Sequence, residues 1–189
     1  MKSDQNIFLL VLLSGIAQIF FQFHFQFWQA LMLKNGFNQS FMAPIYIIFQ
    51  VISIGAFSFP ASSIKLNSLI KKSNLIILLF TASLIAIYFT TSYLLLVFYS
   101  FSVFIFTYLT YVYESEFQSH ISNEQRSTMT SFLSSSSRIC GVLGLMAASL
   151  GLKYLSLKLI IVIGFFISIM ITWLLIKHSR IHEIKIEST

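Results

Sequence analysis

Long apolar stretches separated by short polar segments run through the whole chain. Each stretch is close to or above the roughly 17–25 residues that an α-helix needs to cross a bilayer. The polar segments between them are short and leave no room for a separate soluble domain. The pattern therefore predicts an all-α integral membrane protein with one domain over residues 1–189. Its six helices are expected at about 7–33, 41–63, 74–91, 93–117, 127–150 and 158–177, followed by a tail at 178–189.

The first stretch contains FFQFHFQFWQ at residues 20–29, where polar and aromatic residues alternate as they do in a β-strand. Because the surrounding apolar run is far longer than a strand, we place it on a helix at about 100° per residue. His24 then lies opposite one face that carries four amides, Gln18, Gln22, Gln26 and Gln29. Hydrocarbon offers amides no partners, so this face must meet protein or water. We favour the wall of a polar pathway, and hydrogen bonding between packed helices is the alternative.

The helix at 93–117 carries a second set of polar residues at helical spacing. Aromatic and hydroxyl side chains share one of its faces: Tyr99, Ser102, Thr110 and Tyr113, with Phe106 among them. Such a face suits a cavity for an amphiphilic solute. It equally suits packing in which each hydroxyl is satisfied by a neighbour. Both interpretations stay open from the sequence.

The helix at 127–150 contains Arg138, about a dozen residues from its predicted start. At 1.5 Å per residue this is about 18 Å deep, near the middle of a bilayer. An arginine at this depth is costly and indicates a functional site with a partner. The six acidic residues lie at helix ends or in loops, and Glu114 is the nearest in depth. Backbone carbonyls, nearby serines, water, an anionic solute or a carboxylate of another chain are the candidate partners, and a polar packing cluster is the alternative.

Composition supports the membrane interpretation. Hydrophobic residues make up 57% of the chain and charged residues only 10%, where a soluble domain carries about 25%. The formal net charge of +6 does not indicate nucleic-acid binding, because no basic cluster alternates with aromatic residues on a soluble face. In membrane proteins lysine and arginine instead gather in cytoplasmic segments.

The distribution of basic residues predicts the orientation. With the N-terminus inside, only Lys34, Lys153 and Lys158 fall outside. The eight basic residues on the inner side are Lys2, Lys65, Lys71, Lys72, Arg126, Lys177, Arg180 and Lys185. The positive-inside rule therefore places both termini in the cytoplasm, for a multi-pass protein of the cell membrane.

Catalytic and metal-binding motifs are sparse. The spans carry no aspartate pair, no GxSxG and no HExxH, so we expect no enzymatic activity. The single cysteine, Cys140, excludes CxxC metal sites and internal disulfides. His178 and His182 stand four residues apart without the glutamate of a zinc motif, which indicates a solvated tail. We therefore expect no cofactor and no metal.

Three stretches give the chain a resemblance to a known family. They are FQFWQALMLKNGF, the segment GAFSFPASSIKLNSLIKKSN with Gly55 and the Lys71–Lys72 pair, and the segment NEQRSTMTSFLSSSSRICGVLGLMAASLGLKYLSLK that begins near Arg126. Together with six helices and inner termini, they resemble the C-terminal six-helix half of a major facilitator superfamily transporter, helices seven to twelve. The resemblance covers nearly the whole chain.

This resemblance implies transport of a small organic solute, such as efflux of a drug or metabolite, by alternating access between two six-helix halves. The partners implied are the solute, the lipid bilayer and a second half, which is an N-terminal half or a second copy of the chain. The amide face, the face that includes Tyr99 and Tyr113, and Arg138 would then border the central cavity. The alternative function is a membrane assembly or regulatory module that transports nothing.

Overall fold

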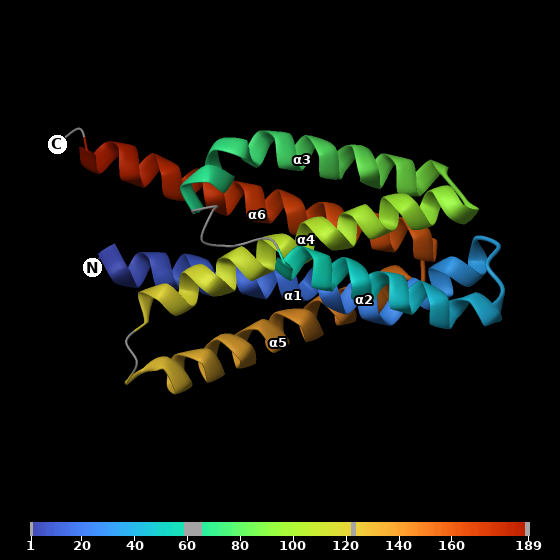
Figure 1. The fold of residues 1–189 in the computed structure, drawn as a ribbon, viewed down its shortest axis with the longest axis horizontal. Helices are drawn as coiled ribbons and strands as arrows, with labels where there is room; N and C mark the ends of the chain where they lie inside the picture. The colour runs from blue at the N-terminus through green and yellow to red at the C-terminus, as the bar shows by residue number, and fades with distance from the viewer. Residues whose placement is uncertain (1, 59–65, 122–123, 188–189) are drawn as a thin grey trace.

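The computed structural model describes residues 2–58, 66–121 and 124–187. These residues form helices and contain no strand (Figure 1). The FFQFHFQFWQ stretch lies well inside the first of them, so its apparent alternation is a feature of a helix. The elements are α1 (Lys2–Lys34), the short 3-10 helix η1 (Gln39–Phe41), α2 (Met42–Ser58), α3 (Leu66–Phe89), α4 (Ser92–His120), α5 (Arg126–Gly151) and α6 (Leu157–Glu187).

The six long helices confirm the predicted all-α architecture. Five of them are long and apolar enough to cross a membrane, and the apolar segment Ser73–Phe89 of α3 is shorter. The predicted end of the second helix, at 59–63, lies outside the described residues. At the other end of the chain, α6 continues through most of the predicted tail to Glu187.

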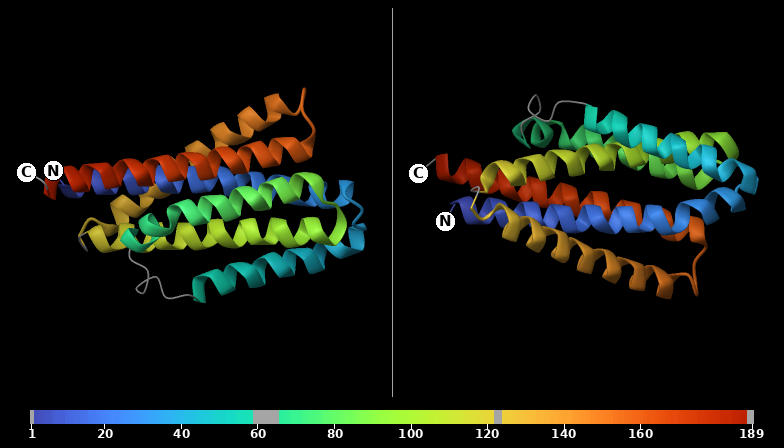
Figure 2. Two further views of the ribbon diagram at one scale, coloured as in Figure 1. Left: turned by 90° about the horizontal axis from the view of Figure 1, so that it is seen from above. Right: turned by 60° about the horizontal axis from the view of Figure 1, so that its bottom comes forward.

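The packing of the helices is symmetric in the order of the chain. The principal neighbours of α1 are α5, α6 and α4, and those of α4 are α2, α3 and α1, while α3 also packs on α6. Exchanging the first three helices for the last three leaves this pattern unchanged. Figures 1 and 2 show that α1 runs opposite to α4, α2 to α5, and α3 to α6. In packing and in direction, α1–α3 and α4–α6 are therefore related as the two copies of an inverted repeat would be.

Aromatic side chains fill the centre where α1, α3, α4 and α6 meet. The Phe20 and Phe106 rings stack with centroids 4.0 Å apart, and the Phe165 centroid lies 4.1 Å from that of Phe20. Phe80 contacts both Phe20 and Phe106, and all four side chains are buried. Burial of such rings contributes dispersion contacts along with specific ring geometry. We call Phe20, Phe80, Phe106 and Phe165 the aromatic cluster.

Both termini lie at one end of the bundle, which we call the terminal end (Figure 1). At the opposite end, hydrogen bonds join three connections. The Lys158 ammonium on α6 donates to Asn35 Oδ1 at 3.3 Å and to the Thr90 carbonyl at 2.5 Å. The Ser92 N–H donates to the Asn35 carbonyl at 3.2 Å. The ends of α1 and α3 and the starts of α4 and α6 are therefore held together at this end.

Candidate functional site

A polar cavity of about 680 Å³ lies between α1, α4 and α5. It is formed by the first half of α1, the last part of α4 and the first half of α5, and these three segments lie toward the terminal end (Figure 1). The lining residues are Ser14, Ala17, Gln18, Phe21, Thr110, Tyr111, Glu114, Ser115, Gln118, Thr130, Leu133, Ser134, Ser137 and Arg138.

Helical geometry explains how hydroxyl groups line this space without disturbing their helices. Thr110 Oγ1 donates to the Phe106 carbonyl at 2.8 Å, and Ser137 Oγ donates to the Leu133 carbonyl at 2.7 Å. Each bond returns one turn along the same helix, which satisfies the hydroxyl hydrogen and leaves oxygen lone pairs for a ligand or water. Since Phe106 belongs to the aromatic cluster, closely packed rings begin one turn beyond Thr110, on the side away from the terminal end.

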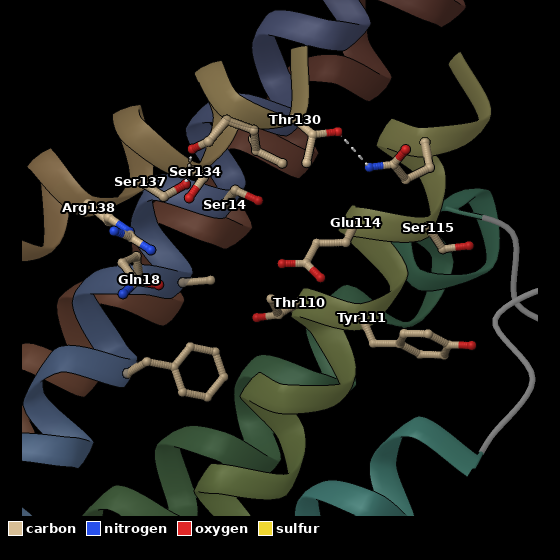
Figure 3. Close-up of a pocket in the computed structure, with 14 residues that line it drawn as sticks. Ser14, Gln18, Thr110, Tyr111, Glu114, Ser115, Thr130, Ser134, Ser137 and Arg138 are labelled. Atoms are coloured by element: carbon tan, nitrogen blue, oxygen red, sulfur yellow. Dashed lines mark hydrogen bonds between the residues drawn. The ribbon is translucent and has the colours of Figure 1, made fainter. Parts of the chain in front are cut away.

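Two opposite charges face the cavity from different walls. Arg138 lies on α5 beside Gln18 of α1, and Glu114 lies on α4 across from them (Figure 3). Within the described part of the chain, no hydrogen bond or ion pair is formed by either charge. Glu114 is therefore the acidic residue that shares the cavity with Arg138, but the two side chains are not in direct contact.

The amide face of α1 follows its predicted direction but does not lie in one environment. Gln18 lines the cavity. Gln22 is half-buried at the contact between α1 and α5, where a Cβ on Gly141 would lie only 2.7 Å from Gln22 Cγ. Gln26 and Gln29 are exposed and do not line the cavity. Gln18 also approaches Gly141, but of the two only Gln18 borders the cavity as well, so the pathway interpretation stays a prediction for Gln18.

His24 lies opposite these amides, as the helical geometry predicted, and is packed in the core. It is 4% exposed, and its ring contacts the Phe49 ring of α2. Its Nδ1 lies 3.1 Å from Tyr99 Oη, in a buried hydrogen bond between α1 and α4.

The polar face predicted on α4 is divided among several neighbours. Only Thr110 reaches the cavity. Tyr99 is bound to His24, and Ser102 Oγ lies 3.0 Å from Ser83 Oγ of α3. Tyr113 is buried on the side of α3 and α6, beside a gap of about 20 Å³. Because α4 lies at the centre and has neighbours around it, one face of it meets several helices, and three of the four residues belong to the packed core.

Glu114 and Ser14 are two of the lining residues that were not predicted to border a pathway. Glu114 follows Thr110 by one helical turn, so the two share a face. That spacing was available in the sequence. Ser14 likewise precedes Gln18 by one turn on the amide face. Helical periodicity alone therefore predicts both residues on the lining faces. Glu114 lies close to the end of its predicted helix, which indicated a surface position instead.

A second hollow, of about 770 Å³, lies along the outer side of α5. All of its lining residues belong to α5: Arg126, Ser127, Thr130, Ser131, Ser134, Ser135 and Arg138. Thr130, Ser134 and Arg138 therefore border both hollows. The first half of α5 presents hydroxyl and guanidinium groups outward as well as inward, on a face that the other five helices do not cover.

Among the described residues, no group of three or more histidine, cysteine, aspartate or glutamate side chains is placed to hold a metal ion. Comparisons of the chain with protein-family models, with curated proteins and with solved structures find no match.

Proposed function

We propose that the chain is one half of a membrane transporter of the major facilitator type, which moves a small polar organic solute by alternating access. The observation that carries this proposal is the polar cavity, set within six helices that pack as an inverted repeat. Inverted repeats with a solute site at the repeat interface are characteristic of secondary transporters. The helices α1 and α4, which exchange under the repeat, supply two of the three cavity walls.

The outer side of α5 supports the requirement for a second six-helix half. Serine hydroxyls and a guanidinium facing hydrocarbon would be left without partners, at a cost of several kcal/mol in total. A second half, either an N-terminal half or a second copy of the chain, would cover this hollow and close the cavity. With both termini in the cytoplasm, as the positive-inside rule predicts, the cavity faces the cytoplasmic side of the cell membrane.

The same hollow favours one alternative, a membrane module that binds a partner chain and transports nothing. The two functions differ in whether the cavity becomes accessible from both sides of the membrane. This difference can be measured without knowing the solute, because the chain has a single cysteine, Cys140.

The experiment places one cysteine in a Cys140→Ala background and labels it with a membrane-impermeant maleimide. The labelling is done in cells and in inside-out vesicles of the same membrane. For a transporter we expect Ser134→Cys, in the cavity, to be labelled from both sides. Tyr154→Cys, at the opposite end and 85% exposed, reports sidedness and is expected to react from one side only. Ser168→Cys, which is 1% exposed in α6, is the unreactive control.

Labelling of Ser134→Cys from one side alone, with the two controls behaving as stated, would contradict alternating access and favour the assembly module. For a transporter, a saturating solute is also expected to change the rate at which Ser134→Cys reacts, because a bound solute alters the distribution between the two open states.

A further inference from the structure

The charges in the cavity are balanced but separated. Arg138 contributes one positive charge from α5 and Glu114 one negative charge from α4, and both side chains point into the space between the helices (Figure 3). No ion pair joins them, so their charged atoms lie more than 4.0 Å apart. The cavity therefore has a positive wall and a negative wall instead of a single neutralised pair.

Most of the other lining residues are polar, and Ala17, Phe21 and Leu133 are the apolar ones. Besides the two charges, the lining carries six serine and threonine hydroxyls and two amides, from Ser14, Thr110, Ser115, Thr130, Ser134, Ser137, Gln18 and Gln118. Aromatic lining is limited to Phe21 and Tyr111, and Figure 3 shows the Tyr111 ring directed away from the two charges. Sites for drug-sized apolar ligands are lined mainly by hydrophobic and aromatic side chains. This lining differs from such sites and suits a small solute that carries its own polar groups.

We propose that the solute of this cavity is a small zwitterion, whose anionic group binds Arg138 and whose ammonium group binds Glu114. This inference rests on the proposed transport function and specifies its substrate class. A guanidinium presents donors in a planar fork that suits a carboxylate, and a carboxylate accepts hydrogen bonds from an ammonium group.

The two opposite charges are also expected to repel solutes that carry a single charge. A solute with only a negative charge meets Arg138 favourably but brings a like charge into the same cavity as Glu114. A solute with only a positive charge meets the reverse problem at Arg138. Like charges brought together in a confined site are a means of rejecting wrong ligands. Only a solute with both charges satisfies both walls.

The test measures binding of a matched set of probes to the purified full-length chain in lipid nanodiscs. The probes are 4-aminobutyrate, butyrate and butylamine, which share a four-carbon chain and differ in their charges. We expect 4-aminobutyrate to bind at least tenfold more tightly than either singly charged probe. Glycine and 6-aminohexanoate, with shorter and longer spacing, then measure the separation of the charges. Glycine is expected to bind most weakly of the three amino acids, because its two charges lie closest together whereas those of the cavity are on separate walls.

Two charge-neutral variants assign the walls. Glu114→Gln is expected to weaken 4-aminobutyrate at least tenfold while butyrate binds as well as before or better. Arg138→Gln is expected to weaken 4-aminobutyrate similarly while butylamine is retained or improved. Glu124→Gln and Lys153→Gln remove exposed charges outside the cavity and serve as matched controls. A monodisperse size-exclusion profile for each variant shows that loss of binding is not loss of folding.

Equal binding of the three four-carbon probes, binding that both variants leave unchanged, or no binding of any amino acid would overturn the inference. None of these results bears on two-sided labelling of Ser134→Cys, which tests the transport function by itself. Conversely, selective binding of 4-aminobutyrate together with one-sided labelling would leave a zwitterion site in a protein that does not transport.

Discussion

Replacement of Gly164 by alanine tests how closely α6 packs against α1. A methyl group at this position would overlap Cε1 and Cδ1 of the Phe23 ring, and Phe23 is only 5% exposed, so the ring has little room to move. Forcing an extra methyl group into a packed core costs about 1–3 kcal/mol. Alanine also removes the helix-propensity penalty of glycine, roughly 1 kcal/mol. The sum predicts that Gly164→Ala lowers the free energy of unfolding by about 0–2 kcal/mol.

Gly55→Ala in α2 is the matched control, because a Cβ there would meet nothing within 4 Å. Its expected effect is the propensity term alone, a stabilisation of roughly 1 kcal/mol. The difference between the two variants, about 1–3 kcal/mol, therefore isolates the overlap with the Phe23 ring. It is measured by titrating the purified protein with sodium dodecyl sulfate and following the loss of helix–helix contacts by tryptophan fluorescence.

Equal shifts for the two variants would refute the close contact between α1 and α6. A further check combines Gly164→Ala with Phe23→Leu, which makes room for the new methyl group. If the overlap is the cause, the double variant is more stable than the sum of the two single effects. Simple additivity would place the cost of Gly164→Ala elsewhere.

Two more predictions concern hydrogen bonds that hold the bundle together. Tyr99→Phe leaves the buried His24 ring without its hydrogen-bond partner and is expected to destabilise the protein by about 1 kcal/mol. Tyr154→Phe, at an exposed site, is the control and is expected to leave the melting temperature unchanged. Equal melting temperatures for the two variants would contradict this prediction. Lys158→Met removes the ammonium that joins the ends of α1 and α3 and is expected to lower the free energy of unfolding by about 1.5–3 kcal/mol. Lys153→Met, which changes an exposed side chain, is expected to leave the melting temperature unchanged within error. Equal melting temperatures for the two lysine variants would show that the hydrogen bonds of Lys158 do not stabilise the opposite end of the bundle.

The helices were predictable from the sequence because a bilayer imposes a length that apolar runs must match. Their ends were less so. The length of an apolar run reports the part inside hydrocarbon, whereas backbone hydrogen bonding continues into water. This is why α6 extends to Glu187, beyond a predicted end near residue 177. The predicted and observed ends of α6 differ because the apolar run reflects burial in lipid, whereas the helix is defined by backbone hydrogen bonding.

Only part of the candidate site was predictable, for a reason that α1 and α4 illustrate. Periodicity on one helix gives the direction of a side chain, and it correctly separated His24 from the amides. It does not give which neighbour lies in that direction. Gln18 and Gln22 point the same way and both approach Gly141, yet only Gln18 also lines the cavity. That distinction depends on how closely α5 approaches α1 at each turn.

Three charged side chains in the predicted spans have contrasting surroundings, and the contrast separates structural from functional roles. Lys158 donates hydrogen bonds to two oxygens of neighbouring connections, so its charge stabilises the opposite end of the bundle. Arg138 and Glu114 contact no such partner in the described structure and face a shared cavity instead. Both side chains are exposed within the chain, so neither contributes to packing among its six helices. The two charges are therefore best explained by what enters the space between them.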